Sequence, residues 1–190
     1  PAVDGLRAFD FGPENQAVRF GFTPCSQELY ARALGYGWSK RGIARDYFHP
    51  NDLLGDFRDA TGAMFSVDVP DGRYHVLVYF EEHGWWEDQF CFFSWRTITA
   101  QKKVVVDERL TKEQIAAQFY RFADTEPSPR SDLYDIYIRN GRFKPKEFEV
   151  DVAGGTLDIR FDADAAMACR VAALVLWPVS SARMADEWRA

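Results

Sequence analysis

The sequence has few of the residues that build metal and redox centres. Its 190 residues include three cysteines and three histidines. Cys25, Cys91 and Cys169 are widely separated, and no two of them have the spacing of zinc ligands, which argues against a zinc site. Two interpretations of the thiols stay open: one disulfide with one free thiol, or three buried thiols that pack as small apolar side chains.

Basic residues are outnumbered, and long apolar runs are missing. With 23 Lys and Arg against 29 Asp and Glu, the net charge is −6, and no basic run offers the counterion release on which nucleic-acid binding depends. No apolar run approaches the about 20 residues that span a bilayer. We therefore expect neither nucleic acid nor a membrane as a partner. The chain starts at Pro1 without a signal-peptide pattern, so we interpret it as a piece of a longer protein.

What the sequence does contain is a series of short alternating apolar runs separated by turn residues. These runs lie at residues 8–11, 18–22, 64–69, 74–80, 92–99, 103–107, 134–139, 148–152 and 157–161, and residues 171–177 are almost entirely apolar, as in a central strand covered on both faces. Roughly nine or ten strands at this spacing predict a β-sandwich. We expect the sandwich to span residues 7–178, with residues 179–190 as a connector or short helix toward a following domain.

Two turns predict hairpins. Val69-Pro70-Asp71-Gly72-Arg73 separates the run at 64–69 from the run at 74–80, and its Pro and Gly supply the backbone angles of a tight turn. Ala153-Gly154-Gly155 separates the runs at 148–152 and 157–161 in the same way. Each pair of runs is therefore predicted to be two neighbouring antiparallel strands.

A short helix and a long loop complete the predicted elements. Thr111 and Gln114 form a capping box, which predicts a helix directly after them. Residues 23–59 show no clear helix or strand period and predict a long loop, in which flanking glycines free the backbone to expose Tyr36 and Trp38. The alternative is that these rings pack against one end of the sandwich.

The run at residues 74–80 leads directly into a cluster of rings and charges. The cluster is Glu81, Glu82, His83, Gly84, Trp85, Trp86, Glu87, Asp88 and Gln89. Successive side chains of an extended backbone point to opposite faces, so Trp85 and Trp86 cannot both enter one core. An indole among carboxylates, a histidine and an amide suits a sugar ring, which has an apolar C–H face and polar hydroxyls. The alternative is that both rings fill the core.

Four stretches are informative together: Phe9-Asp10-Phe11-Gly12-Pro13, Gly35-Tyr36-Gly37-Trp38, Phe65-Ser66-Val67-Asp68-Val69-Pro70-Asp71-Gly72-Arg73-Tyr74 and Gly155-Thr156-Leu157-Asp158-Ile159. They resemble galactose-binding-like, malectin-like β-sandwich modules. The resemblance covers residues 7–178 and implies an all-β, jelly-roll sandwich, here with one or two short helices. It also implies a carbohydrate ligand on loops at one end of the sandwich, with Tyr36, Trp85 and Trp86 at ligand-binding positions.

Such modules often accompany the catalytic domains of secreted polysaccharide-degrading enzymes, so the resemblance implies an extracellular or periplasmic location. The sequence departs from the pattern in its Trp-Trp pair and in an insertion around residues 101–132. These departures leave the identity of the sugar open.

The predicted function is that of a non-catalytic carbohydrate-binding module, which attaches a glycan-degrading enzyme to its polysaccharide. The predicted ligand-binding residues are Tyr36, Trp38, Glu82, His83, Trp85, Trp86 and Asp88. The expected partners are an oligo- or polysaccharide and an adjacent catalytic domain. No catalytic residue is predicted. No cofactor is required, although structural calcium is allowed, with Asp10, Glu14, Asp162 and Asp164 as oxygen donors in no dedicated calcium-loop spacing.

Two alternatives come from other functional classes. A structural domain could use the same rings against a neighbouring protein domain, since aromatic residues are enriched at interfaces. A polysaccharide lyase could use His83 and Tyr79 for proton transfer and Arg96 to neutralise a uronate carboxylate. The adjacent carboxylates in the cluster fit a solvated surface better than the opposed acid pair of a glycosidase.

Overall fold

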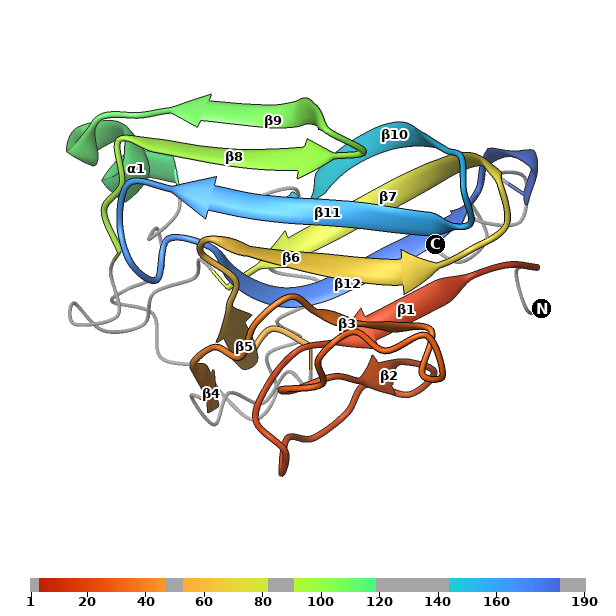
Figure 1. Cartoon of the computed structure of the whole chain (residues 1–190). Helices are drawn as coiled ribbons and strands as arrows, with labels where there is room; N and C mark the ends of the chain where they lie inside the picture. Colours follow the sequence, from red (N-terminus) through yellow and green to blue (C-terminus); the bar gives the residue numbers. More distant parts are fainter. Residues whose placement is uncertain (1–3, 47–52, 82–90, 119–143, 182–190) are drawn as a thin grey trace.

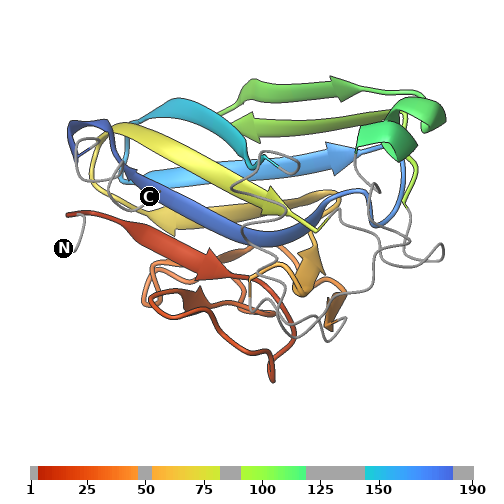
Figure 2. The ribbon, with the colours of Figure 1, turned by 180° about the vertical axis from the view of Figure 1, so that it is seen from behind.

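Two β-sheets pack face to face around a common core in the computed structural model, which describes residues 4–46, 53–81, 91–118 and 144–181 (Figure 1, and from behind in Figure 2). This confirms the predicted all-β sandwich. One α-helix, α1 (Lys112–Gln118), lies within the described residues. None of the described helices is both long and apolar enough to cross a membrane.

The first sheet is built around β12 (Arg170–Pro178). Its strand order is β10 (Lys146–Val152), β7 (Gly72–Phe80), β12, β1 (Arg7–Asp10) and β2 (Thr23–Pro24), and β5 (Asp56–Asp59) joins the start of β12 and carries β4 (Ala44–Asp46) on its other edge. All residues of β12 from Arg170 to Trp177 are buried. The inner row of β12 faces the common core, and its outer row packs into a second apolar cluster with Leu53 and Leu54. This confirms a central strand covered on both faces.

The second sheet is apolar on the inside, except for Arg96 of β8, and polar on the outside. Its order is β3 (Tyr36–Trp38), β6 (Ala63–Asp68), β11 (Thr156–Ala163), β8 (Trp95–Ala100) and β9 (Lys103–Arg109). The inner rows of β6, β11 and β8 are fully buried in the core, while hydroxyls and charges such as Ser66, Asp158 and Arg160 alternate with them. This is the alternation expected of an antiparallel sheet with one uncovered face.

The two predicted hairpins are wrong, because each turn carries the chain from one sheet to the other. β6 belongs to the second sheet and β7 to the first, and the same division separates β10 from β11. The two strands on either side of each turn both direct a row of apolar side chains into the same core. Their sequences therefore show the same apolar–polar alternation as the two strands of a hairpin. The two connections are joined by Asp71, whose Oδ1 accepts the N–H groups of Gly154 and Gly155 at 2.8 Å each.

Of the other predicted strands, loops and helix caps, some are confirmed and some are wrong. β8 and β9 do form a hairpin, and the capping box is present, with Thr111 N–H donating to Gln114 Oε1 at 2.8 Å. Residues 23–59 hold the short strands β2 to β5 rather than one irregular loop. The run at 18–22 forms no strand, and Phe20 is 100% exposed. Residues 134–139 lie outside the described part of the chain.

The chain leaves the sandwich through a short 3-10 helix. It covers Val179–Ser181, directly after β12. Residues 182–190, which complete the predicted connector, are outside the described residues.

Cys25, Cys91 and Cys169 form no disulfide, but the expectation of three buried thiols holds only for Cys25 and Cys169, because Cys91 is partly exposed. Burial raises the pKa of Cys169 to about 12 and also raises the pKa of Cys25. Both thiols therefore stay protonated and act as small apolar side chains.

Candidate functional site

The predicted ligand-binding residues divide into two groups. Glu82, His83, Trp85, Trp86 and Asp88 lie outside the described residues, and their predicted role stays a prediction. The described part of the chain shows the two flanks of their segment, which are Glu81 and Cys91. Tyr36 and Trp38 lie within the described residues.

Trp38 is a core residue, which corrects the prediction that it stacks on a ligand. Its side chain is 1% exposed, the guanidinium of Arg58 lies 3.9 Å from its ring centre, and the rings of Phe11 and Phe65 are each 4.9 Å away, centre to centre. The physical reason is its place on β3. Trp38 is paired with Phe65 of β6, and directly opposite residues point to the same face of the sheet, so both rings face the core. The adjacent Gly37 permits close backbone packing rather than exposure.

Tyr36 is half-buried and belongs to the opposite end of the sandwich. Its ring packs 5.0 Å from that of Phe9, and burial raises the pKa of its phenol. It pairs with Val67 near the end of β6, where β7 begins, whereas Glu81 follows the end of β7. The nine residues of β7 correspond to about 26 Å of strand between these two ends. We call the end at Glu81 and Cys91 the loop end, and the end at Tyr36 the pocket end.

Three buried arginines form the base of the loop end. Arg58, Arg96 and Arg170 are 0%, 1% and 6% exposed. Each guanidinium lies over an aromatic ring; that of Arg96 is 4.0 Å from the centre of Phe80 and 4.5 Å from that of Phe93. Cationic planes on aromatic faces are stable in a low-dielectric site.

A buried carboxylate and a partly buried one neutralise two of these arginines. Arg170 Nη1 donates to Glu81 Oε2 at 3.0 Å, and both side chains are at most 7% exposed. Arg96 Nε donates to Glu108 Oε2 at 2.7 Å, and the other oxygen of Glu108 accepts from Lys146 Nζ at 2.6 Å. The predicted ligand segment is thus anchored at Glu81 by a buried ion pair. Breaking such a pair by removing one partner costs about 3–5 kcal/mol.

The lyase alternative relies on three residues, of which Tyr79 and Arg96 lie within the described part of the chain. Tyr79 belongs to the outer apolar cluster of the first sheet, where it pairs with Ala173. Arg96 lies on the inner row of the second sheet and is clamped between Phe80 and Phe93. The two side chains therefore do not converge on one point, and the geometry disfavours a shared catalytic role.

The oxygen donors considered for calcium do not converge either. Within the described residues, no group of three His, Cys, Asp or Glu side chains is placed to hold a metal ion. Asp162 pairs with Arg160, and Asp164 accepts from Ser94, whose hydrogen bond lowers the pKa of that carboxyl. Structural calcium therefore stays a prediction.

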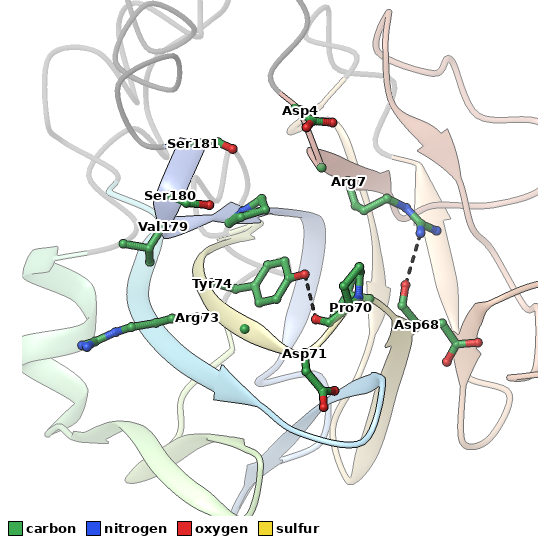
Figure 3. A pocket seen from close by; sticks show the side chains of 14 residues that line it. Asp4, Arg7, Asp68, Pro70, Asp71, Arg73, Tyr74, Val179, Ser180 and Ser181 are labelled. Atoms are coloured by element: carbon green, nitrogen blue, oxygen red, sulfur yellow. Dashed lines mark hydrogen bonds between the residues drawn. The ribbon is translucent and has the colours of Figure 1, made fainter.

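A hollow of about 690 Å³ opens at the pocket end, and sequence reasoning missed it (Figure 3). It lies between the start of β1, the Pro70–Asp71 connection and the segment after β12. The lining residues are Asp4, Gly5, Arg7, Asp68, Val69, Pro70, Asp71, Gly72, Arg73, Tyr74, Pro178, Val179, Ser180 and Ser181. They come from parts of the chain far apart in sequence, which are brought together by the pairing of β1 with β12, the pairing of β12 with β7 and the connection from β6 to β7. We call this hollow the Arg7 pocket.

The centre of the Arg7 pocket is apolar and held in place. Tyr74 is buried and donates its hydroxyl proton to the carbonyl of Pro70 at 2.9 Å (Figure 3). Pro178 packs against Gly5, where an added Cβ would lie 2.8 Å from Pro178 Cγ. Arg7 enters from β1 and donates to the carbonyl of Asp68 at 3.3 Å. A fixed apolar floor with polar groups at its rim is a general feature of small-ligand sites.

Comparisons with known proteins identify the fold. No protein-family model matches the sequence, and no curated protein is significantly similar to it. Among solved structures, the YxiM protein of Bacillus subtilis matches 92% of this chain and 40% of its own, with a TM-score of 0.58 and 18% identity. Bacteroides uniformis β-glucuronidase 2 matches 92% of this chain and 18% of its own, with a TM-score of 0.57 and 16% identity.

The plant receptor-like kinase FER is similar to the same extent. It matches 92% of this chain and 42% of its own, with a TM-score of 0.53 and 15% identity. These likenesses are consistent with a galactose-binding-like, malectin-like β-sandwich, and at such identities they concern the fold alone. The chain spans less than half the length of each of these proteins.

Proposed function

We propose that this chain is a non-catalytic carbohydrate-binding module, which holds a glycan-degrading enzyme on its polysaccharide. The observation that carries the proposal is that a similar sandwich occurs in a larger glycan-degrading enzyme. A similar sandwich makes up a minor part of a β-glucuronidase, of which the matched region is 18%. A sandwich of this size beside a catalytic domain suits an attachment role.

The proposed binding segment is the one between Glu81 and Cys91, with Trp85 and Trp86 stacking on sugar rings and Glu82, His83 and Asp88 bonding hydroxyls. Support comes from its described flanks. Glu81 is fixed by the buried ion pair with Arg170, and Cys91 Sγ donates to the carbonyl of Ala166 at 3.2 Å. A binding segment held at both ends loses less conformational entropy when it binds.

The proposal includes the setting of the module. We propose a secreted, multidomain protein that acts outside the cytoplasm, with an adjacent catalytic domain as the partner within the chain. Stacking and a few hydrogen bonds give affinities from about micromolar to millimolar. Calcium would act in such a module as a structural ion and not in binding chemistry.

A second candidate is a domain that contacts a neighbouring protein domain. It is favoured by exposed apolar side chains between β1 and β3: Phe20 is 100% exposed, and Val18, Leu29 and Leu34 are each more than one third exposed. Exposed apolar side chains of this kind mark protein interfaces when they form a continuous patch.

Glycan retention by paired variants tests the proposal. We would measure binding to a panel of polysaccharides for the wild type, for Trp85→Ala/Trp86→Ala and for Phe20→Ser, with folding checked by circular dichroism. The Phe20 variant is the matched control, because it removes one exposed ring elsewhere. Retention that is lost in the Trp variant and kept in the Phe20 variant supports the module. Retention unaffected by loss of both tryptophans would refute the proposed segment, and a fall in polymer size would favour an enzyme.

A further inference from the structure

We infer that the Arg7 pocket is a second ligand site, which binds a uronic acid unit of a glycan through its carboxylate. This inference rests on the proposal that the ligand of the domain is a carbohydrate. It concerns a different part of the molecule, because Arg7 pairs with Leu176, which pairs with Val76, and Val76 precedes Glu81 by about 16 Å of strand.

Most charges around the pocket already have partners within the protein. Asp71 accepts two backbone N–H groups, and Asp68 accepts the hydroxyls of Tyr30 and Thr156 at 2.9 Å each. Arg73 points away from the pocket (Figure 3) and pairs with Glu149 at 2.8 Å. Each of these charged groups therefore already has a partner within the protein.

Arg7 is the exception. It is half-buried, and no carboxylate among the described residues pairs with it. Its guanidinium makes one long hydrogen bond, to the carbonyl of Asp68, and lies 5.5 Å from the centre of the Phe9 ring. A guanidinium carries five N–H donors in a planar fork that matches a carboxylate. Arg7 therefore keeps donors for an anionic ligand and is oriented by the ring beneath it.

The rest of the pocket suits a sugar rather than a phosphate. Pro70 and Pro178 supply apolar surface for the C–H face of a ring, and the buried Tyr74 holds Pro70 in place through its hydrogen bond. Asp4, Ser180 and Ser181 stand at the rim and have acceptor and hydroxyl groups for sugar hydroxyls (Figure 3). The carboxylates of Asp4 and Asp71 would repel a dianionic phosphate about twice as strongly as a singly charged uronate, whose hydroxyls can also donate to carboxylates.

The pocket also has the size and rigidity of a binding site. Its volume of about 690 Å³ falls within the range of roughly 300–1,000 Å³ of small-ligand sites. The hydrogen bond from Tyr74 to Pro70 and the packing of Gly5 on Pro178 hold the floor and the rim in position.

The test compares a glucuronate-containing oligosaccharide with its carboxyl-reduced counterpart, which keeps the linkages and loses the charge. Binding to the full chain would be measured by calorimetry and by backbone amide shifts of Gly5, Gly72 and Ser180. We expect the acidic oligosaccharide to bind about 10-fold or more tightly than the reduced one, as one charge-assisted hydrogen-bond pair implies. Equal affinities of the two oligosaccharides, or shifts confined to other residues, would overturn the inference.

Variants separate the role of Arg7 from a structural effect. Arg7→Gln should abolish the preference for the charged oligosaccharide, and Arg7→Lys should keep part of it, since the charge remains but the fork is lost. Arg73→Gln is the control for a nearby arginine that already has a partner, and it should keep the full preference. If Arg7→Gln does not fold, Arg7→Lys provides the test. An unchanged ratio of the affinities for the acidic and the reduced oligosaccharide in Arg7→Lys would then contradict bidentate binding of the carboxylate by the guanidinium.

The same experiment distinguishes the two proposals. Trp85→Ala/Trp86→Ala should leave the preference for the uronate at the Arg7 pocket intact while removing retention at the loop end. Retention of neutral glycans without any preference for the acidic oligosaccharide would refute the Arg7 site and leave the proposed function standing. A preference that needs Arg7 and persists without the two tryptophans would support the Arg7 site alone.

Discussion

Replacing Glu108 by Gln should destabilise the sandwich strongly, because one carboxylate neutralises two cations there. Glu108 lies 2.7 Å from Arg96 Nε and 2.6 Å from Lys146 Nζ, and the side chain of Arg96 is 2% exposed. The amide of Gln can occupy the same space but leaves the charge of Arg96 buried without its counter-ion. The expected loss is about 3 kcal/mol, the lower end of values for broken buried pairs, since Glu108 itself is 14% exposed.

The pH dependence gives this prediction a second readout. Burial raises the pKa of Glu108, but the charges of Arg96 and Lys146 outweigh burial, and the pKa lies below its ordinary value of 4.5. A carboxyl whose pKa is lower in the folded state stabilises the protein above its unfolded pKa, and this contribution is lost as the pH falls through the folded pKa. The stability difference between wild type and Glu108→Gln should therefore be constant at neutral pH and shrink below about pH 4.5.

Urea unfolding followed by tryptophan fluorescence measures both effects. At neutral pH a loss of about 3 kcal/mol corresponds to a melting temperature lower by roughly 6–12 °C for a domain of this size. Glu149→Gln is the matched control, because Glu149 also bridges two basic side chains, Arg73 and His75, but on the surface. Its cost should stay below about 1 kcal/mol. A loss from Glu108→Gln no larger than that of the control, or one that does not shrink in acid, would refute the reasoning.

Three further variants test the packing and the connections. Trp38→Ala should cost about 3–5 kcal/mol in unfolding free energy, whereas Phe20→Ser should change it by less than about 0.5 kcal/mol; similar values for both would contradict the burial of Trp38. Gly37→Ala should destabilise by more than about 1 kcal/mol, because the new Cβ would lie 2.5 Å from the backbone nitrogen of Tyr30; an unchanged melting temperature would argue against this close approach. Asp71→Ala leaves two glycine N–H groups without their acceptor and should cost about 1–2 kcal/mol, with faster hydrogen exchange of those two amides as the specific sign and unchanged exchange as the contrary result.

The sandwich could be predicted from the sequence because its core rows are simple. Phe65 and Val67 alternate with polar residues, as do Leu157 and Ile159, and all four are fully buried. The pairing of the strands could not be predicted in the same way. A turn such as the one around Asp71 can close a hairpin or cross between sheets, and in both cases the apolar rows face one core. Only contacts between distant residues, such as Ile159 opposite Phe65 and opposite Ala100, decide the topology.

The position of Trp38 could not be predicted either, because it too depends on residues that are distant in the sequence. Trp38 was predicted to face a ligand from its glycine neighbours, yet its ring fits the space between Phe11, Phe65 and Arg58. A buried arginine over a core tryptophan leaves no periodic signal, because the arginine itself reads as a surface residue. Burial lowers the pKa of Arg58 to about 10, a sign of how far this guanidinium is removed from water.

The separation of the two ends changes what binding to a polymer should look like. Tyr36, which sequence reasoning grouped with the tryptophan pair, lies at the pocket end with Arg7, and Glu81 lies at the loop end. If both ends bind sugar, a polysaccharide long enough to reach both converts the second contact into an intramolecular one, and its overall affinity exceeds that of either site. A short oligosaccharide can occupy one site only. Loss of either site should therefore weaken retention on the polymer in part, while it removes one whole class of short ligands.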